Sequence, residues 1–130
     1  MVCCETDFLV AILRGDKDAA ERLKTLEAGG EALTATAITV YELLKGARMS
    51  ARAEQNTSKV VALSRRMEVL PVGEREVELA SSIYAKHARK GKMMGEFDVL
   101  IAAVAKENGE ALLTRDEAFR GVEGLKTLRW

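Results

Sequence analysis

The sequence has few of the residues that build disulfide frameworks and zinc sites. Its two cysteines, Cys3 and Cys4, are adjacent, so a disulfide between them would be strained and no second pair exists. We interpret them as small apolar residues of a protein in a reducing cytoplasm. His87 is the only histidine, and no Cys or His residues stand at zinc-ligand spacing.

The chain also lacks an excess of charge and any long apolar run. Twenty Lys and Arg residues balance twenty Asp and Glu residues, so binding to nucleic acid would have to come from a local patch. No apolar run is long enough to span a bilayer, and Met1 and Val2 lead straight into the cysteines without the regions of a secretory signal. We expect one domain, residues 1–130, in the cytoplasm.

Apolar periodicity predicts strands that alternate with helices. The expected strands are 2–5, 33–37, 68–72, 111–113 and 125–130, and the expected helices are 7–13, 17–27, 40–46, 50–67, 74–90 and one with an apolar middle at 99–105. Pro71 places the third strand at a sheet edge. Thr39 stands three residues before Glu42, which predicts a capping box with Glu42 in the first helical turn. The alternation predicts an α/β domain with a largely parallel sheet.

Acidic residues stand at or near the ends of these strands. Glu5 and Asp7 follow the first strand, Glu42 follows the second, Asp116 follows the fourth, and Asp98 opens the helix before the fourth. In parallel α/β sheets ligands bind outside the carboxyl ends of the strands. Each acid alone serves equally well as a solvated helix cap. Together, the carboxylates would raise one another's pKa unless a divalent cation bound them. Oxygen ligands favour Mg²⁺ or Mn²⁺, and such ions promote hydrolysis of phosphodiesters.

Three segments carry a resemblance to a known family. They read ETDFLVAILRGD, TAITVYELLKGA and FDVLIAAVAKENGEALLTRDEAF. In this order they resemble the D-T-x-x-L opening, the Glu-bearing helix and the D-x-L-I-A-A…T-x-D-x-x-F core of the PIN-domain family, specifically of its VapC-type toxin ribonucleases. The resemblance covers nearly the whole chain. It implies a three-layer α/β fold, in which helices flank a five-stranded, mostly parallel sheet.

The resemblance also implies a site and partners. The metal-binding acids would be Glu5, Glu42, Asp98 and Asp116, with support from the Thr114 hydroxyl and from Thr6. It further implies a homodimer, a cognate antitoxin that covers the acidic pocket, and an RNA substrate.

One position departs from the family pattern. The family usually has Asp before the Thr, and this chain has Glu5, which is one methylene longer. A Mg²⁺ site demands near-ideal octahedral geometry, so the activity could be reduced, or Asp7 could share the role. We expect Asp7, at a helix start, to point elsewhere, and we rank Glu5 first. Glu96 is either an additional acid beside the ligands or a solvated residue before the helix.

Basic residues suggest where RNA would bind. Lys86, Arg89, Lys90 and Lys92 lie near a predicted helix end, and Arg115 lies near the acids. They either hold RNA phosphates or form an ordinary solvated helix end. We expect His87, on the apolar face of its helix, to be a partly buried packing residue rather than a base.

The sequence therefore predicts a Mg²⁺- or Mn²⁺-dependent endoribonuclease that is the toxin of a toxin–antitoxin pair. One alternative is a PIN nuclease that processes RNA without an antitoxin. Another is a catalytically weakened module whose acids bind a metal or a basic peptide.

Overall fold

Five parallel strands form one sheet in this computed structural model, which describes residues 1–130. Their order is β3-β2-β1-β4-β5. The strands are β1 (Val2–Cys4), β2 (Leu33–Thr36), β3 (Glu68–Leu70), β4 (Ala111–Leu113) and β5 (Thr127–Leu128). The predicted parallel sheet is confirmed, and β3 lies at an edge, as Pro71 indicated.

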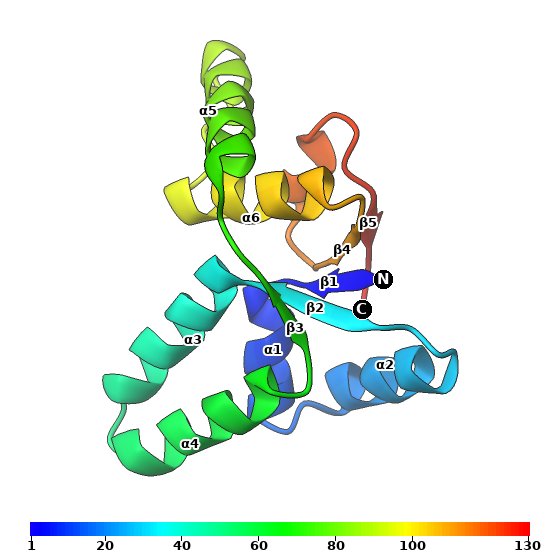
Figure 1. Cartoon of the computed structure of the whole chain (residues 1–130), viewed down its shortest axis with the longest axis vertical. Helices are drawn as coiled ribbons and strands as arrows, with labels where there is room; N and C mark the ends of the chain where they lie inside the picture. The colour runs from blue at the N-terminus through cyan, green and yellow to red at the C-terminus, as the bar shows by residue number, and fades with distance from the viewer.

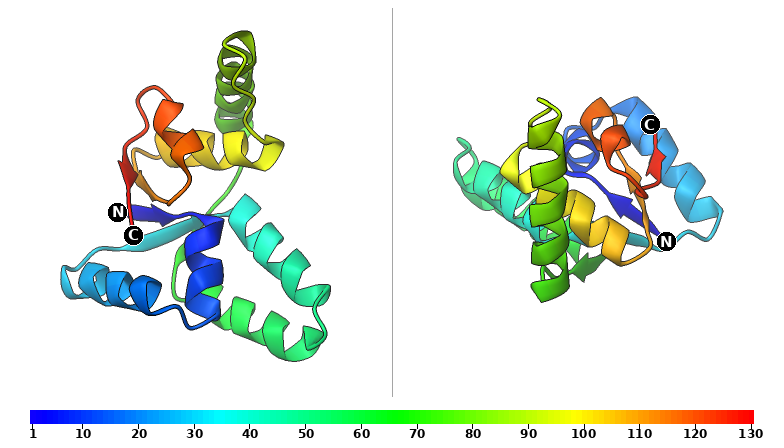
Figure 2. Two further views of the ribbon diagram at one scale, coloured as in Figure 1. Left: turned by 180° about the vertical axis from the view of Figure 1, so that it is seen from behind. Right: turned by 90° about the horizontal axis from the view of Figure 1, so that it is seen from above.

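Helices cover both faces of the sheet, which gives three layers (Figures 1 and 2). One face carries α5, α6 and the short 3-10 helix η1, and the other carries α1 to α4. The helices are α1 (Thr6–Leu13), α2 (Lys17–Ala28), α3 (Ala37–Arg48), α4 (Ala53–Ser64), α5 (Glu74–Arg89), α6 (Glu96–Glu107) and η1 (Glu117–Gly121). None of them is long and apolar enough to cross a membrane.

The two cysteines show how the sheet divides the core. Side chains of a strand alternate between its faces, so Cys3 belongs to the apolar cluster under α5 and α6, and Cys4 to the cluster under α1 to α4. Both are fully buried and unpaired. Burial raises the pKa of each thiol to about 12, which leaves them protonated and unreactive. The prediction that they act as small apolar residues is confirmed.

The strand order places a topological switch point between β1 and β4. The connections from β1 to β2 and from β2 to β3 run over the face of α1 to α4, whereas the connection into β4 runs through α5 and α6 on the other face. Ligands of open parallel sheets bind where the connections diverge in this way. The carboxyl ends of β1 and β4 are therefore the place to look for a site.

The start of α3 differs from the expected capping box. The cap is Thr36, whose hydroxyl accepts the backbone N–H of Thr39 at 3.0 Å, and the helix begins at Ala37. No acidic residue lies in its first turn, so the expected position of Glu42 is wrong. The reason is that β2 ends at Thr36, where a hydroxyl is already available to the first free N–H groups. Glu42 lies one turn further from the sheet than predicted.

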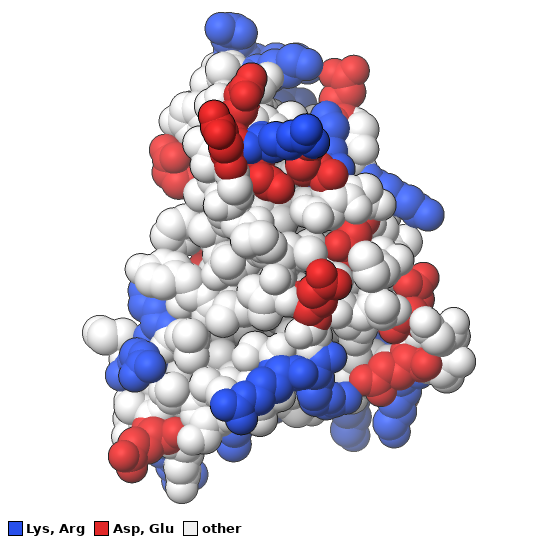
Figure 3. All heavy atoms as spheres, in the orientation of Figure 1, with Lys and Arg blue, Asp and Glu red and all other residues white.

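Several boundaries are shorter than predicted. Glu5 caps α1 instead of ending β1, α4 spans 53–64, and β5 has only two residues. Leu128 and Trp130 still pack inward, with the Trp130 ring edge-on to Phe8 at 5.3 Å between centroids. His87 is half-buried, as predicted. Acidic and basic side chains are interspersed over the face in Figure 3, and neither sign dominates it.

Candidate active site

Glu5 lies at the centre of the carboxyl edge of the sheet. It follows β1 directly, its backbone N–H bonds to Leu113 of the neighbouring β4, and its side chain is only 4% exposed. Its Oε2 accepts the backbone N–H of Asp7 at 3.2 Å and the Thr114 hydroxyl at 3.4 Å. Its Oε1 accepts no hydrogen bond and is accessible to solvent. The carboxylate is thus held on one side and open on the other.

The electrostatics show that other acids surround Glu5. Burial, together with the charges of Asp7, Asp98 and Glu42, raises the pKa of Glu5 to about 8, although the hydrogen bond from the Asp7 backbone acts in the opposite direction. Burial also raises the pKa of Asp98, together with the charges of Asp116, Glu42 and Asp7. The four acids that the sequence singled out as ligands therefore lie at one edge of the sheet, near enough for their charges to act on Glu5 or Asp98.

Asp7 contributes more than the sequence suggested. We expected it to point elsewhere, and it is indeed exposed at the start of α1. Its charge is nevertheless the largest of those that raise the pKa of Glu5, and it also acts on Asp98. Glu96, in contrast, is exposed in the first turn of α6 and does not contribute to either shift.

A chain of threonine hydroxyls positions Glu42. The Thr6 hydroxyl donates to Glu42 Oε1 at 2.8 Å and lies 3.0 Å from the hydroxyl of Thr39, which in turn lies 3.3 Å from that of Thr36. Thr36 and Thr39 are fully buried. Sequence reasoning named Thr6 but missed these two hydroxyls as supports of the site. The only signal was the threonine spacing, which we assigned to a capping box.

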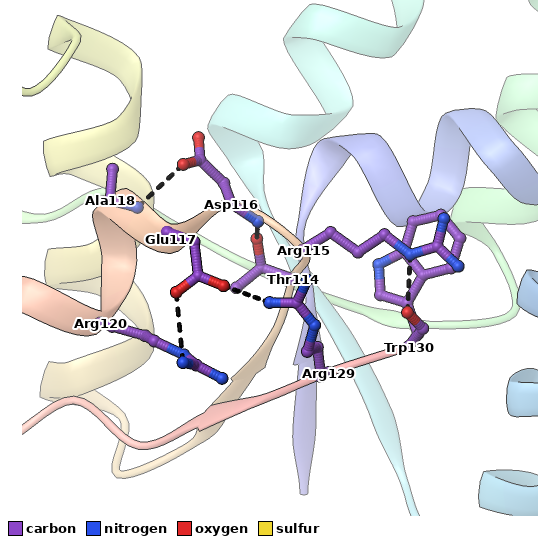
Figure 4. Close-up of polar contacts among 8 residues, drawn as sticks. All are labelled: Thr114, Arg115, Asp116, Glu117, Ala118, Arg120, Arg129 and Trp130. Carbon is purple, nitrogen blue, oxygen red and sulfur yellow. Dashed lines mark hydrogen bonds and ion pairs between the residues drawn. The ribbon is translucent and has the colours of Figure 1, made fainter.

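Asp116 and Thr114 bring the end of β4 into the site. The Thr114 hydroxyl accepts the backbone N–H of Asp116 at 3.0 Å while it donates to Glu5, so one hydroxyl links the acids of the two strands. Asp116 caps η1, with its Oδ1 accepting the N–H of Ala118 at 2.9 Å (Figure 4). The supporting role predicted for Thr114 therefore has a geometric basis.

The four acids have the donor chemistry that Mg²⁺ and Mn²⁺ prefer, because all their ligand atoms are oxygens. Each keeps at least one carboxylate oxygen without a hydrogen-bond partner in the protein; the set is Glu5, Glu42, Asp98 and Asp116. As they stand, no three acids are arranged closely enough to hold an ion. Glu42 and Asp116 are hydrogen-bonded to Thr6 and Ala118, and binding an ion would require the acidic side chains to move closer together.

The predicted RNA-binding residues fall into two places. Arg115 turns away from Asp116 and stacks on Trp130, 3.6 Å from the ring centroid, with its Nε bonded to the Trp130 carbonyl at 2.6 Å (Figure 4). Its other contact is Asp18, at 3.5 Å. Arg89, Lys90 and Lys92 lie together at the end of α5 and are exposed.

The fold agrees with sequence comparison. Residues 2–125 match the PIN domain family, and the chain belongs to that family. Over 96 residues it is 31% identical to the tRNA(fMet)-specific endonuclease VapC of Shigella flexneri. The matched segment covers 73% of each of the two proteins.

Solved structures confirm the likeness of the fold. The chain superimposes on the structure of VapBC2 from Rickettsia felis bound to a DNA fragment from its promoter with a TM-score of 0.90 and 23% identity, covering 100% of this chain and 99% of the other. For DNA-bound VapBC from Salmonella typhimurium the TM-score is 0.89 and the identity 25%, with 99% and 97% covered.

Proposed function

We propose that this protein is a metal-dependent endoribonuclease that hydrolyses phosphodiester bonds in RNA. The observation that carries the proposal is the group of acids around Glu5 at the switch point of the sheet, whose charges raise the pKa of Glu5 and of Asp98. The similarity to a relative named as a tRNA(fMet)-specific endonuclease supports RNA as the substrate. The proposed ligands of one or two Mg²⁺ or Mn²⁺ ions are Glu5, Glu42, Asp98 and Asp116.

The protein groups have distinct tasks in this reaction. A bound divalent cation would activate water for attack on the phosphodiester and offset the charge that develops on it. Thr114 holds Glu5 through Oε2 and leaves its Oε1 free for a cation. Thr6 holds Glu42 through Oε1 and leaves its Oε2 free. Metal binding requires deprotonated carboxylates, so Glu5, with a pKa of about 8, would release its proton as the ion binds.

We further propose that the protein is the toxin of a toxin–antitoxin pair, that residues 1–130 are a single PIN domain, and that the protein acts in the cytoplasm as a homodimer. The likeness to the VapBC complexes of Rickettsia felis and Salmonella typhimurium supports a VapB-type antitoxin as the partner. A neighbouring small gene for a DNA-binding protein would distinguish such a toxin from an RNA-processing nuclease that acts alone.

The test is cleavage of structured and single-stranded RNAs in Mg²⁺, Mn²⁺ or EDTA. We expect cleavage with one of the metals, none in EDTA, and none by Asp98→Asn, which keeps the shape of the side chain and removes its charge. Glu78→Gln is the matched control, because Glu78 is an exposed acid on α5 without a side-chain partner, and it should cleave like the wild type. Cleavage that survives EDTA or the Asp98 substitution contradicts the proposal.

A further inference from the structure

A cavity lies near the acidic edge, between the end of α5, the loop that follows α5, and η1. Its volume is about 330 Å³. Side chains with different chemistry form its walls. The residues from α5 and the loop are His87, Lys90, Lys92, Met93 and Met94, and η1 contributes Glu117, Ala118 and Gly121.

The cavity has a net positive charge. Lys90 and Lys92 form no ion pair, unlike Lys86 on the same helix, which pairs with Glu123 at 3.5 Å. The one acid in its lining, Glu117, is bonded to both Arg120 and Arg129 (Figure 4), so its charge is offset. The free charges in the cavity are therefore the two lysines. A cavity of this charge suits a phosphate group.

The cavity adjoins one of the site acids, Asp116. Ala118, which lines it, donates its backbone N–H to Asp116 at 2.9 Å. On the other wall, the loop leads through Gly95 into the first turn of α6, where Asp98 lies. An RNA chain bound at Asp116 would therefore have the cavity beside it.

The cavity also offers a surface for a base. The Nδ1 of His87 lies 3.0 Å from the Ile83 carbonyl, which fixes the ring, and its Nε2 faces Gly121, where an added Cβ would lie only 3.3 Å away. Met93 is 68% exposed and adaptable in shape. A volume of about 330 Å³ is at the lower end for small-ligand sites, which span about 300–1,000 Å³, so it admits one nucleotide and excludes a duplex.

We propose that this cavity binds one unpaired nucleotide of the RNA next to the cleaved bond, with its phosphate on Lys90 and Lys92 and its base against His87 and Met93. The proposal rests on the proposed ribonuclease function and adds to it the place where the nucleotide beside the cleaved bond is held. Aromatic rings and histidine commonly stack with bases that leave a helix.

Binding in EDTA tests the charge of the cavity without cleavage. The probe is a fluorescent, unstructured RNA of twelve nucleotides, compared with the same RNA annealed to its complement. Lys90→Gln/Lys92→Gln should weaken single-strand binding about tenfold and reduce the slope of log affinity against log salt by about 0.7, the value for one neutralised phosphate. Lys24→Gln, which removes an exposed lysine on the opposite face of the sheet, is the matched control. An unchanged slope, or an equal loss with Lys24→Gln, overturns the proposal.

A second pair of variants tests the base contact. His87→Ala should weaken single-strand binding about fivefold or more, the scale of one lost base stack, while the salt slope stays the same. Gly121→Val, which directs a side chain toward His87, should have the same effect. Thermal melting checks that both variants fold. Full single-strand affinity in both folded variants, or an equal loss of duplex binding, overturns the assignment.

The experiments distinguish failure of the ribonuclease proposal from failure of the nucleotide-site proposal. If the lysine variants behave as expected and wild type cleaves no RNA with any metal, the ribonuclease proposal falls and the nucleotide site stands. If wild type cleaves RNA and the cavity variants bind it fully, the nucleotide site falls and the ribonuclease proposal stands.

Discussion

The two ends of the central strands each hold a buried glutamate, and the two differ in their surroundings. Glu5 at the carboxyl end and Glu110 at the amino end are each 4% exposed. Glu110 receives one hydrogen bond, from the Thr34 hydroxyl at 2.7 Å, and its Oε2 is fully buried without a partner. Glu5 has two partners on Oε2, a solvent-accessible Oε1, and three other acids close enough to raise its pKa.

The difference shows that burial alone does not identify a functional acid. Glu110 connects β4 to β2 beneath β1, which is a contact within the sheet. Glu5 instead combines burial with like charges and an open oxygen, an arrangement that is unfavourable in the protein alone. A cation would relieve it. Substitutions at the two glutamates should therefore have opposite consequences for activity and stability.

The largest expected effect is on cleavage. Glu5→Gln should lower kcat/KM with Mn²⁺ at least about 100-fold, because even residues that only support metal ligands commonly cost 10–100-fold when changed. Glu110→Gln should change it less than about threefold. The measurement is cleavage of the most reactive RNA by both variants at equal folded concentration. If Glu5→Gln retains its activity while Asp7→Asn abolishes it, the first metal ligand is Asp7.

The next effect is on stability against pH in EDTA. The pKa of Glu5 is raised from 4.5 to about 8, so the folded protein holds a proton there that the unfolded chain releases. This stability is fully present below pH 4.5 and is lost as the pH rises through about 8, by about 1.4 kcal/mol per pH unit for one proton. Asp98, whose pKa is also raised, acts in the same direction.

Urea unfolding between pH 5 and pH 9 measures this slope. Glu5→Gln should flatten it and make the metal-free protein more stable than wild type at pH 9. Parallel curves for wild type and Glu5→Gln would show that Glu5 ionises normally. Added Mn²⁺ at pH 8 should stabilise wild type, by about 2.7 kcal/mol at one hundred times its Kd, and should stabilise Glu5→Gln much less.

The fold and the candidate ligands were predictable from the sequence because they depend on local patterns. Strand and helix periodicity gave the α/β order, and the acids that follow strands gave Glu5 and Asp116. The hydroxyl chain from Thr39 through Thr6 was not predictable, since its members are 33 residues apart and meet only when β1 and β2 pair. The burial of Glu110 was also not predictable, because the sequence alone does not distinguish a buried glutamate from a solvated one.

The smallest expected effect concerns the amino end of the sheet. Thr34→Val removes the only hydrogen-bond donor to the Glu110 side chain and leaves a buried carboxyl group unpaired, which should cost about 1–3 kcal/mol of unfolding free energy. Thr34→Val/Glu110→Met removes both partners with little change in volume and should recover most of that loss, because no polar group is then left unsatisfied. Urea unfolding at pH 6 compares the two variants, and cleavage by the folded fraction should match wild type in both. A loss of cleavage without a loss of stability would mean that the two ends of the strands are coupled, and Glu110 would then belong with Glu5 and not apart from it.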